Sequence, residues 1–215
     1  MNDKKETRIE PGMVVSSRIR LARNLKKFPF PSRLSNQGAE EMKELLRGIF
    51  KECSSEPFDF LDMKNVTSVQ AGAMMEEHLI SPEFAKGSEH SALILGRNKC
   101  LSVMVNEEDH LRIQAMGSGA CLEELYEKIN ALDDAVDDHV EYAFSEKYGY
   151  LTACPTNLGS GMRASVMLHL PALTRRGLMD RVINSVSQVG ITVRGLYGEG
   201  TQAGACLYQV SNAVS

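Results

Sequence analysis

Five arginines stand in short stretches of the sequence that do not resemble an ordinary surface of mixed charge. They are Arg18 and Arg20 in SSRIR, Arg112 in NEEDHLR, Arg163 in CPTNLGSGMRASV and Arg194 in VRGLYGEG. Their neighbours are small or apolar, and an arginine is seldom buried without an anion to meet it. Because the planar guanidinium fork suits phosphate oxygens, several converging forks would hold a polyphosphate and offset charge on a transferred phosphoryl group. Each arginine taken singly is more simply part of a surface salt bridge, so the hypothesis depends on the set.

Carboxylates form the second group that could do chemistry. Glu107, Glu108 and Asp109 directly follow a predicted strand, and Glu199 lies in the glycine-flanked GEG. A guanidinium is always protonated and its nitrogens are poor nucleophiles, so an acceptor of this type must be aligned and its charge balanced. Two carboxylates on separate nitrogens would do this largely by positioning, which contributes roughly 7–11 kcal/mol in ideal cases. On charge alone, the simpler interpretation of the EED run is a polar turn.

Other motifs are weaker or missing from the sequence. GSGMR could bring backbone N–H groups to a phosphate, but it is not the GxxxxGK[ST] of a P-loop. No HExxH, GxSxG or metal-like Cys/His cluster occurs, so no metal ligands are predicted. The cysteines are odd in number and form no CxxC pair, which predicts neither a disulfide framework nor a zinc ribbon. Only Cys154 has suggestive neighbours, and the others suit small buried positions: Cys53, Cys100, Cys121 and Cys206.

Length and composition predict one globular domain with a sizeable core. The chain has 215 residues, of which 43% are hydrophobic and 24% charged, close to the soluble average. Its net charge of −4 argues against a general binder of nucleic acid or anionic membranes. No apolar run reaches the length of a membrane span, and the start, MNDKKETRIEPG, lacks a signal-peptide core. We therefore expect a cytoplasmic protein with no direct nucleic-acid or membrane partner.

The elements that must position these residues can be predicted from hydrophobic periodicity. Period-two patterns predict strands at 13–22, 58–63, 92–95, 100–105, 110–116, 148–152, 191–196 and 206–210. Arg18 and Arg20 are two residues apart, so they leave the same face of the first strand. Helical spacing predicts helices at 38–53, 69–80, 119–140 and 178–189. This order favours an α+β domain with a largely antiparallel sheet flanked by helices, whose strand order the pattern does not give.

Five segments resemble, in order and spacing, the signature segments of the ATP:guanido phosphotransferases, or phosphagen kinases. They are SSRIRLARN, HLISP, VNEEDHLRI, CPTNLGSGMRASV and VRGLYGEG, and the resemblance runs from about residue 14 to 212. The best match is the bacterial protein-arginine-kinase branch. The resemblance implies a glutamine-synthetase-like catalytic domain and ATP-dependent phosphorylation of arginine side chains in proteins, which would mark them for degradation in a stress response.

The resemblance also implies roles for individual residues. Glu108 would orient or deprotonate the guanidinium, with Glu199 as its partner and Glu107 in support, and the thiolate of Cys154 would sit near the guanidinium. Mg²⁺ would accompany ATP, bound mainly through phosphates and water. The five arginines would cradle the ATP phosphates. The nucleotide site as a whole would comprise Ser16, Ser17, Arg18, Ile19, Arg20, His78, Arg112, Arg163, Ala164, Ser165, Val166, Met167, Arg194, Gly195, Leu196, Tyr197, Gly198 and Glu199.

Three departures from the family pattern shape these expectations. Animal phosphagen kinases carry a helical domain before SSR, where this sequence has a short polar lead, and an open site favours protein substrates with exposed arginines. Those enzymes place an arginine at Tyr197 and a carboxylate at Gln202, which moves the second-carboxylate role to Glu199. Residues 1–215 would be a truncated catalytic domain that lacks the closing helix and helical C-terminal domain. With that domain a homodimer is expected, and an activator protein and a Clp-type protease system are expected partners.

Two alternatives stay open at this point. One is a small-molecule guanidino kinase that phosphorylates free arginine or a similar compound. The other is a non-catalytic module that binds nucleotide or phosphoarginine and regulates a partner.

Overall fold

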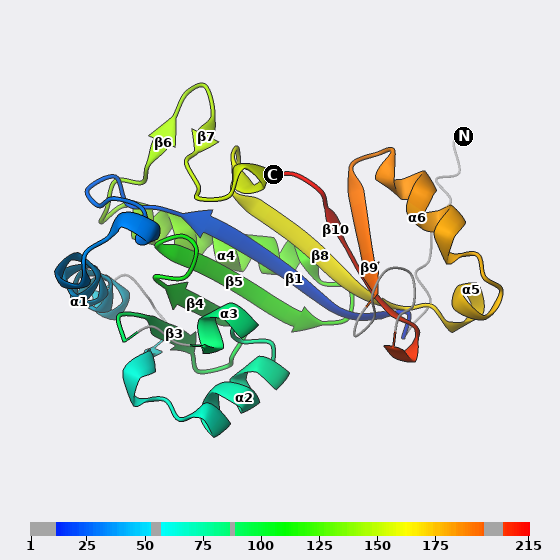
Figure 1. The fold of residues 1–215 in the computed structure, drawn as a ribbon, viewed down its shortest axis with the longest axis horizontal. Coiled ribbons are helices and arrows are strands. Elements are labelled where there is room, and N and C mark those ends of the chain that lie inside the picture. Colours follow the sequence, from blue (N-terminus) through cyan, green and yellow to red (C-terminus); the bar gives the residue numbers. More distant parts are fainter. Residues whose placement is uncertain (1–11, 53–56, 87–88, 196–203) are drawn as a thin grey trace.

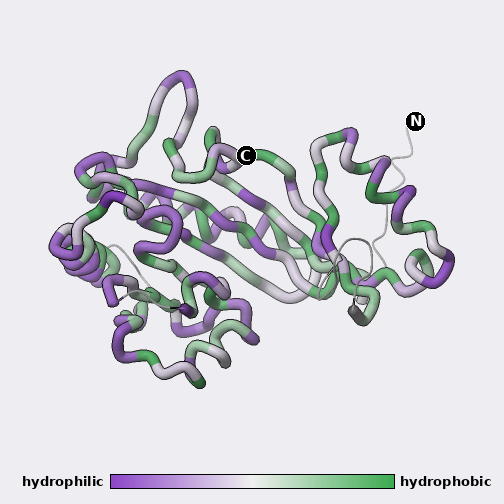
Figure 2. Tube along the Cα trace, viewed as in Figure 1, coloured by the Kyte–Doolittle hydropathy of each residue, from purple (hydrophilic) through white to green (hydrophobic). Residues whose placement is uncertain are grey.

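A computed structural model describes residues 12–52, 57–86, 89–195 and 204–215. Its main feature is one eight-stranded sheet in the order β2-β3-β4-β5-β1-β8-β10-β9, with every neighbouring pair antiparallel (Figure 1). The strands are β1 (Val14–Arg23), β2 (Phe58–Asp62), β3 (Ala92–Gly96), β4 (Leu101–Val105), β5 (Leu111–Ser118), β8 (Met162–His169), β9 (Ile191–Gly195) and β10 (Leu207–Asn212). A separate hairpin pairs β6 (Phe144–Ser145) with β7 (Gly149–Tyr150). Its connecting tip is hydrophilic (Figure 2). The predicted α+β fold with a largely antiparallel sheet is confirmed.

Helices cover both faces of the sheet. The long helices α1 (Asn36–Glu52) and α4 (Leu122–Asp137) pack on one face, where Ile19 and Leu21 of β1 belong to the larger hydrophobic core. The short helices α2 (Ser68–Glu76) and α3 (Pro82–Ala85) cover part of the other face through a smaller core around Leu93 and Met104. Beyond β8 lie α5 (Pro171–Arg175) and α6 (Met179–Ser187). Over the central strands, the face that carries α2 and α3 is occupied by polar side chains.

Several predicted elements differ from the structure. The expected strand at 148–152 is paired only at Gly149–Tyr150. The expected helix at 69–80 ends at Glu76, because His78 has a φ of 57° and turns the chain away. The pattern analysis assigned no strand to Met162–His169, which is the central strand β8. Alternate residues of β8 lie on opposite faces of the sheet. A segment of mixed composition can therefore form a regular strand.

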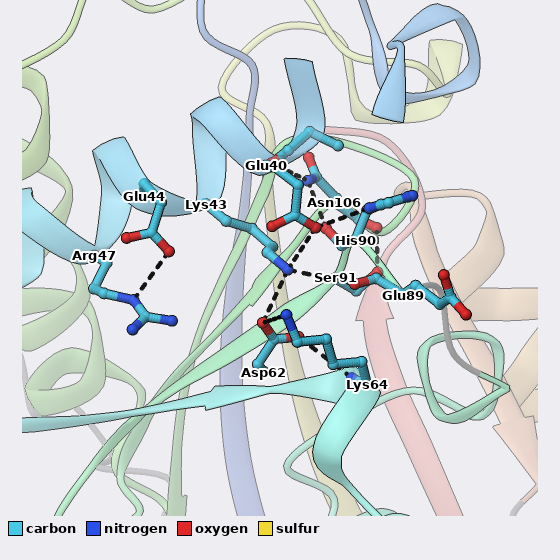
Figure 3. Close-up of polar contacts among 11 residues, drawn as sticks. Glu40, Lys43, Glu44, Arg47, Asp62, Lys64, Glu89, His90, Ser91 and Asn106 are labelled. Carbon is cyan, nitrogen blue, oxygen red and sulfur yellow. Dashed lines mark hydrogen bonds and ion pairs between the residues drawn. The ribbon is translucent and has the colours of Figure 1, made fainter. Parts of the chain in front are cut away.

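A buried lysine ties α1 to the second strand. Lys43 is fully buried, and its Nζ lies 3.0 Å from Asp62 Oδ2 and 3.0 Å from Glu40 Oε1. Glu40 also contacts His90 Nδ1 at 2.8 Å, so the ion pairs extend to the segment before β3 (Figure 3). A buried charge of this kind must be paired, because an unpaired ion in the interior is strongly destabilising.

Asp62→Asn is expected to lower the free energy of unfolding at neutral pH by about 3 kcal/mol, because buried Lys43 loses its most buried counter-charge. Burial alone raises the pKa of Asp62, but hydrogen bonds from Lys43 and Lys64 outweigh it and hold the pKa below its ordinary value. A depressed pKa stabilises the fold above the unfolded-state pKa of about 3.9, and this stabilisation is lost as the pH falls through the folded-state pKa. Urea unfolding from pH 7 to pH 2 should show the deficit of the variant shrinking below about pH 4. A deficit independent of pH would contradict the assignment.

Candidate active site

The register of three central strands brings arginines together on one face of the sheet. Arg20 of β1 is directly opposite Arg163 of β8, and Arg18 lies two residues earlier on the same face. On the other side of β1, Arg112 of β5 is opposite Ala22, which also shares the face of Arg20. Because side chains on one face alternate with period two, these guanidinium groups all project into the region beside α2 and α3. The structure therefore gathers four of the five arginines singled out in the sequence.

The electrostatics of this group are those of an anion site. Burial lowers the pKa of Arg18, and the nearby Arg112 cation lowers it further. Burial also lowers the pKa of Arg20 to about 9, helped by the cations of Arg18, Arg112 and Arg163 and opposed by Glu107. The guanidinium groups keep their protons at neutral pH, so like charges are held close together with too little counter-charge. A bound polyanion would relieve this repulsion, since it offers each fork a pair of oxygens.

A pocket of about 150 Å³ joins the arginines to the candidate catalytic residues. Its walls include Arg20, Arg112 and Arg163 together with Glu108 and Cys154. Thr156, Asn157 and Gly161 complete the wall from the segment before β8. Residues far apart in sequence thus meet in one hollow, with cations beside a carboxylate and a thiol.

The two glutamates after β4 have different environments. Glu107 has a side chain only 7% exposed, and its Oε1 accepts hydrogen bonds from Arg112 Nη1 at 2.6 Å and from Ser81 Oγ at 2.7 Å. Glu108 is 45% exposed and contacts Arg112 Nη2 at a longer 3.3 Å. Glu107 is therefore committed to holding Arg112, whereas Glu108 has lone pairs free for an incoming cation. This arrangement fits Glu108 as the acid that meets the acceptor and Glu107 as its support.

The loop that carries these glutamates is fixed from behind. Asn106 has a φ of 58°, a conformation that asparagine tolerates better than most residues. Its Nδ2 donates to His90 O at 2.9 Å, and Ser91 Oγ donates to Asn106 O at 3.1 Å. Figure 3 shows Asn106 beside the ion pairs of Lys43. The segment at His90 and Ser91 therefore supports both these ion pairs and the loop that carries the glutamates.

Cys154 also lines the pocket. Its Sγ is 3.0 Å from Thr156 Oγ1, and a 3-10 turn at Pro155–Asn157 follows it. Thr152 Oγ1 donates to Cys154 O at 2.8 Å, which fixes the backbone at the cysteine. The thiol is half-buried and faces the same hollow as Glu108.

Four of the ten residues of β1 and β8 that were predicted for the nucleotide site point the other way. The side chains of Ser17, Ile19, Ala164 and Val166 alternate to the α1 and α4 face. Ser17 Oγ donates to Gly119 O at 2.7 Å and accepts from Cys121 N, and Ile19 is in the core. Their side chains do not reach the arginine face, so direct side-chain contact with a nucleotide is not available to them. Ser16, Ser165 and Met167 lie at the alternate positions of the same two strands and are therefore on the arginine face.

The remaining predicted residues lie farther along the same face or outside the described part. Arg194 in β9 pairs with Gln209 of β10. Strand β9 is three strands away from β1, which is about 14 Å at ordinary strand spacing. Gly195 ends β9, whereas Leu196, Tyr197, Gly198 and Glu199 lie outside the described residues. The carbonyl of His78 accepts from Gln114 Nε2 at 2.8 Å, and Gln114 is opposite Arg20. This contact connects HLISP to the arginine face through a residue that the sequence analysis missed.

The glycine loop has a packing role that the sequence analysis did not foresee. Gly161 has a φ of 65°, and a Cβ there would come within 2.6 Å of Arg23 Nη1 and 2.7 Å of Ala22 O. Only glycine fits such a conformation and approach. Gly161 therefore lets the chain enter β8 against β1, and the idea of a phosphate-cradling GSG loop is not needed to explain it.

Among the residues that the structure describes, no group of three or more His, Cys, Asp or Glu side chains could hold a metal ion. None of the helices formed by the described residues combines the length and apolarity that a membrane crossing requires.

Comparison with known proteins places this fold in a class of phosphotransferases. The chain belongs to the ATP:guanido phosphotransferase family, since residues 41–215 match the model of its C-terminal catalytic domain. Among curated relatives, it is 48% identical over 206 residues to a protein-arginine kinase of Clostridium acetobutylicum, covering 94% of this chain and 60% of the relative. It is 45% identical over 206 residues to a protein-arginine kinase of Caldanaerobacter subterraneus, covering 94% and 61%. The chain thus spans about three fifths of the length of these relatives.

Solved structures of the family share the fold. A duplicated taurocyamine kinase from Schistosoma mansoni, with bound components of a transition-state analogue, superposes with a TM-score of 0.84 at 26% identity. The match covers 97% of this chain and 30% of that one. A lombricine kinase gives a TM-score of 0.81 at 23% identity over 94% of this chain and 59% of the other, which bears on the fold alone.

Proposed function

We propose that this chain is the catalytic domain of a protein-arginine kinase, which transfers the γ-phosphoryl group of ATP to an arginine side chain in a polypeptide. One observation carries the proposal: Arg20, Arg112 and Arg163 share a pocket with Glu108 and Cys154. The arginines would bind the phosphates, and the carboxylate and thiolate would face the acceptor. Relatives named protein-arginine kinase support the choice of acceptor.

The proposed reaction balances with these residues. A guanidinium nitrogen attacks the γ-phosphorus, a P–N bond forms, and the bond to the ADP oxygen breaks. The nitrogen loses one proton, which Glu108 accepts directly or passes to solvent. The arginines neutralise charge on the equatorial and leaving oxygens, as expected for a loose phosphoryl-transfer transition state. Mg²⁺ enters as part of the ATP substrate, held mainly by phosphate oxygens and water.

The space beside Glu108 suits an arginine that is part of a polypeptide. Glu107 and Glu108 border two further hollows of about 570 and 560 Å³. One of them extends past Asn36 and His90, and the other past Glu83 and Ser91. Each is much larger than the 150 Å³ pocket among the arginines. Such volumes leave room for residues that flank the target arginine.

A small-molecule guanidino kinase is the second candidate, because the similar solved structures include a taurocyamine kinase. Incubation with ATP and either an unfolded arginine-rich protein, free arginine or taurocyamine separates the two. We expect phosphoarginine on the protein, detected by mass spectrometry under conditions that spare the acid-labile P–N bond. Transfer only to a free guanidine would replace the first proposal with the second. ATP binding without ADP release for any acceptor would favour a non-catalytic module.

The wider biological role is proposed from the family resemblance. Phosphorylated arginines would mark proteins for a Clp-type protease system in a cytoplasmic stress response, with an activator protein as a further partner. In the longer relatives, a homodimer would form through the region beyond the part matched here. Arginine phosphorylation of cellular proteins before and after heat shock, with and without the gene, tests this role.

A further inference from the structure

Two loops that both contribute residues to the pocket are joined by one buried carboxylate. Asp109 Oδ1 accepts hydrogen bonds from Ala153 N at 2.7 Å and from Asn24 Nδ2 at 2.6 Å. Asp109 directly follows Glu108, and Ala153 directly precedes Cys154. Asp109 is 1% exposed and Asn24 is 2% exposed, so solvent does not compete for these bonds. The neighbour of the candidate acid is thus bonded to the neighbour of the candidate thiolate.

Asn24, at the end of β1, holds both loops at once. Its Nδ2 also donates to Leu151 O at 3.0 Å, and its Oδ1 accepts from His110 N at 2.9 Å. Both hydrogens of the amide are therefore used, one on each loop. Next along the chain, Leu25 N donates to His110 Nδ1 at 3.0 Å. These bonds attach the two loops to the central strand that carries Arg18 and Arg20.

Among the described residues, neither the side chain of Glu108 nor that of Cys154 forms a hydrogen bond to the other loop. Glu108 is held by Arg112 at 3.3 Å, and bound phosphates would compete for that arginine. Cys154 bonds to Thr156, which belongs to its own loop. The separation of the carboxylate and the thiol must therefore be set by the backbone beneath them. The hydrogen bond from Ala153 N to Asp109 Oδ1 links the backbones that carry the carboxylate and the thiol, and it does not involve groups that bind the nucleotide.

We propose that Asp109 and Asn24 are positioning residues that fix Glu108 relative to Cys154, and so align the acceptor guanidinium with the γ-phosphate. The inference rests on the proposed function for the identity of the acceptor. A carboxylate suits the task because its hydrogen bonds to N–H donors are charge-assisted and stronger than neutral ones. Displacement of a catalytic group by about 1 Å can cost roughly 10²-fold in rate. If Asp109 and Asn24 only stabilised the fold, their replacement would not lower kcat selectively relative to KM.

The test compares Asp109→Ala, Asn24→Ala and Asp109→Asn with a matched control, Thr67→Ala. The control removes the capping box of α2, away from the pocket, at a cost to stability that is typically about 1 kcal/mol. Four quantities are measured on the whole chain: kcat with a protein acceptor, KM for ATP, Tm, and the rate of Cys154 alkylation by iodoacetamide, mapped by mass spectrometry. The alkylation rate reports on the loop without requiring catalysis.

We expect Asp109→Ala and Asn24→Ala each to lower kcat by roughly 10- to 100-fold, with KM for ATP changed by less than about 3-fold. The double variant should lose little more than either single variant, because both remove one bridge. Alkylation of Cys154 should become several-fold faster as its loop is released. Asp109→Asn keeps an acceptor oxygen for both donors and should restore most of the activity. Thr67→Ala should lower Tm and leave kcat and alkylation near wild type.

Three results would overturn the inference. The first is a normal kcat and alkylation rate in Asp109→Ala, or in Asn24→Ala if Asp109→Ala does not fold. The second is a loss of kcat no greater than that of Thr67→Ala at the same loss in Tm. The third is a rise in KM for ATP that parallels the fall in kcat. A wild-type chain that phosphorylates no arginine would refute the proposed function, whereas alkylation and Tm would still decide whether the bridge exists.

Discussion

Glu108→Gln is expected to lower kcat for arginine phosphorylation by roughly 10³-fold while the affinity for ATP changes by less than about 3-fold. The amide keeps the size of the carboxylate and loses its charge and its ability to accept the proton of the attacking nitrogen. ATP binding should survive, because Arg18, Arg20 and Arg163 are carried by β1 and β8, which this change does not touch. The contact of Glu108 with Arg112 is exposed and long, so its loss costs little stability.

The measurement is a single-turnover assay with a protein acceptor, together with titration of a fluorescent ATP analogue. Glu127→Gln, on the exposed side of α4, is the matched control and should behave as wild type. Near-normal turnover in Glu108→Gln would remove this residue from the reaction. A parallel loss of ATP affinity would mean that Glu108 instead organises the arginines.

Arg20→Lys is the second change with a large expected effect, a fall in kcat of roughly 10²- to 10³-fold. Arg20 lies between Arg18, Arg112 and Arg163, and their cations help to lower its pKa to about 9. The guanidinium fork can bind two phosphate oxygens at once, whereas an ammonium acts as a point charge. Lysine also has an ordinary pKa of about 10.4, so burial among the same cations would favour its neutral form.

Arg20→Lys is also expected to introduce a pH dependence between pH 7 and pH 8 that the wild type lacks. Because the neighbouring cations lower the lysine pKa, kcat of Arg20→Lys should fall as the pH rises over this range and the positive charge is lost. Wild-type Arg20, with a pKa of about 9, should keep most of its positive charge up to pH 8. Arg97→Lys, in the exposed turn between β3 and β4, is the control. A pH profile of Arg20→Lys parallel to that of the wild type would show that the lysine stays charged and that only the fork geometry matters.

Local elements were predicted well from the sequence where one face of an element is apolar. The strand at Val14–Arg23 and the helix at Asn36–Glu52 follow from periodicity, because each buries a continuous stripe in the larger core. The alternation in MRASVMLH was equally regular, with Arg163 and Ser165 on one side and Ala164 and Val166 on the other. Hydrophobic periodicity nevertheless predicts no strand there, because neither face of this segment is a continuous buried apolar stripe.

The candidate site could be predicted in its members but not in its assembly. The short motifs around Arg20, Glu108 and Cys154 indicated that these residues take part in chemistry, because the neighbouring residues offer them few other interactions. The strand order, which puts β1 between β5 and β8, depends on long-range pairing that no local pattern encodes. For the same reason, the sequence ranked Arg194 with the other arginines, whereas the sheet places it three strands away from β1.

The sequence by itself determined the types of elements, the set of residues able to handle phosphate and guanidinium, and the family. Tertiary structure alone decided which side chains share a face, because an antiparallel register converts odd and even positions into opposite surfaces. It also revealed the buried bond from Asp109 to Ala153, which joins loops 44 positions apart. Hydrogen bonds of this kind depend on distances of a few tenths of an ångström, and these arise only when the whole sheet has closed around its core.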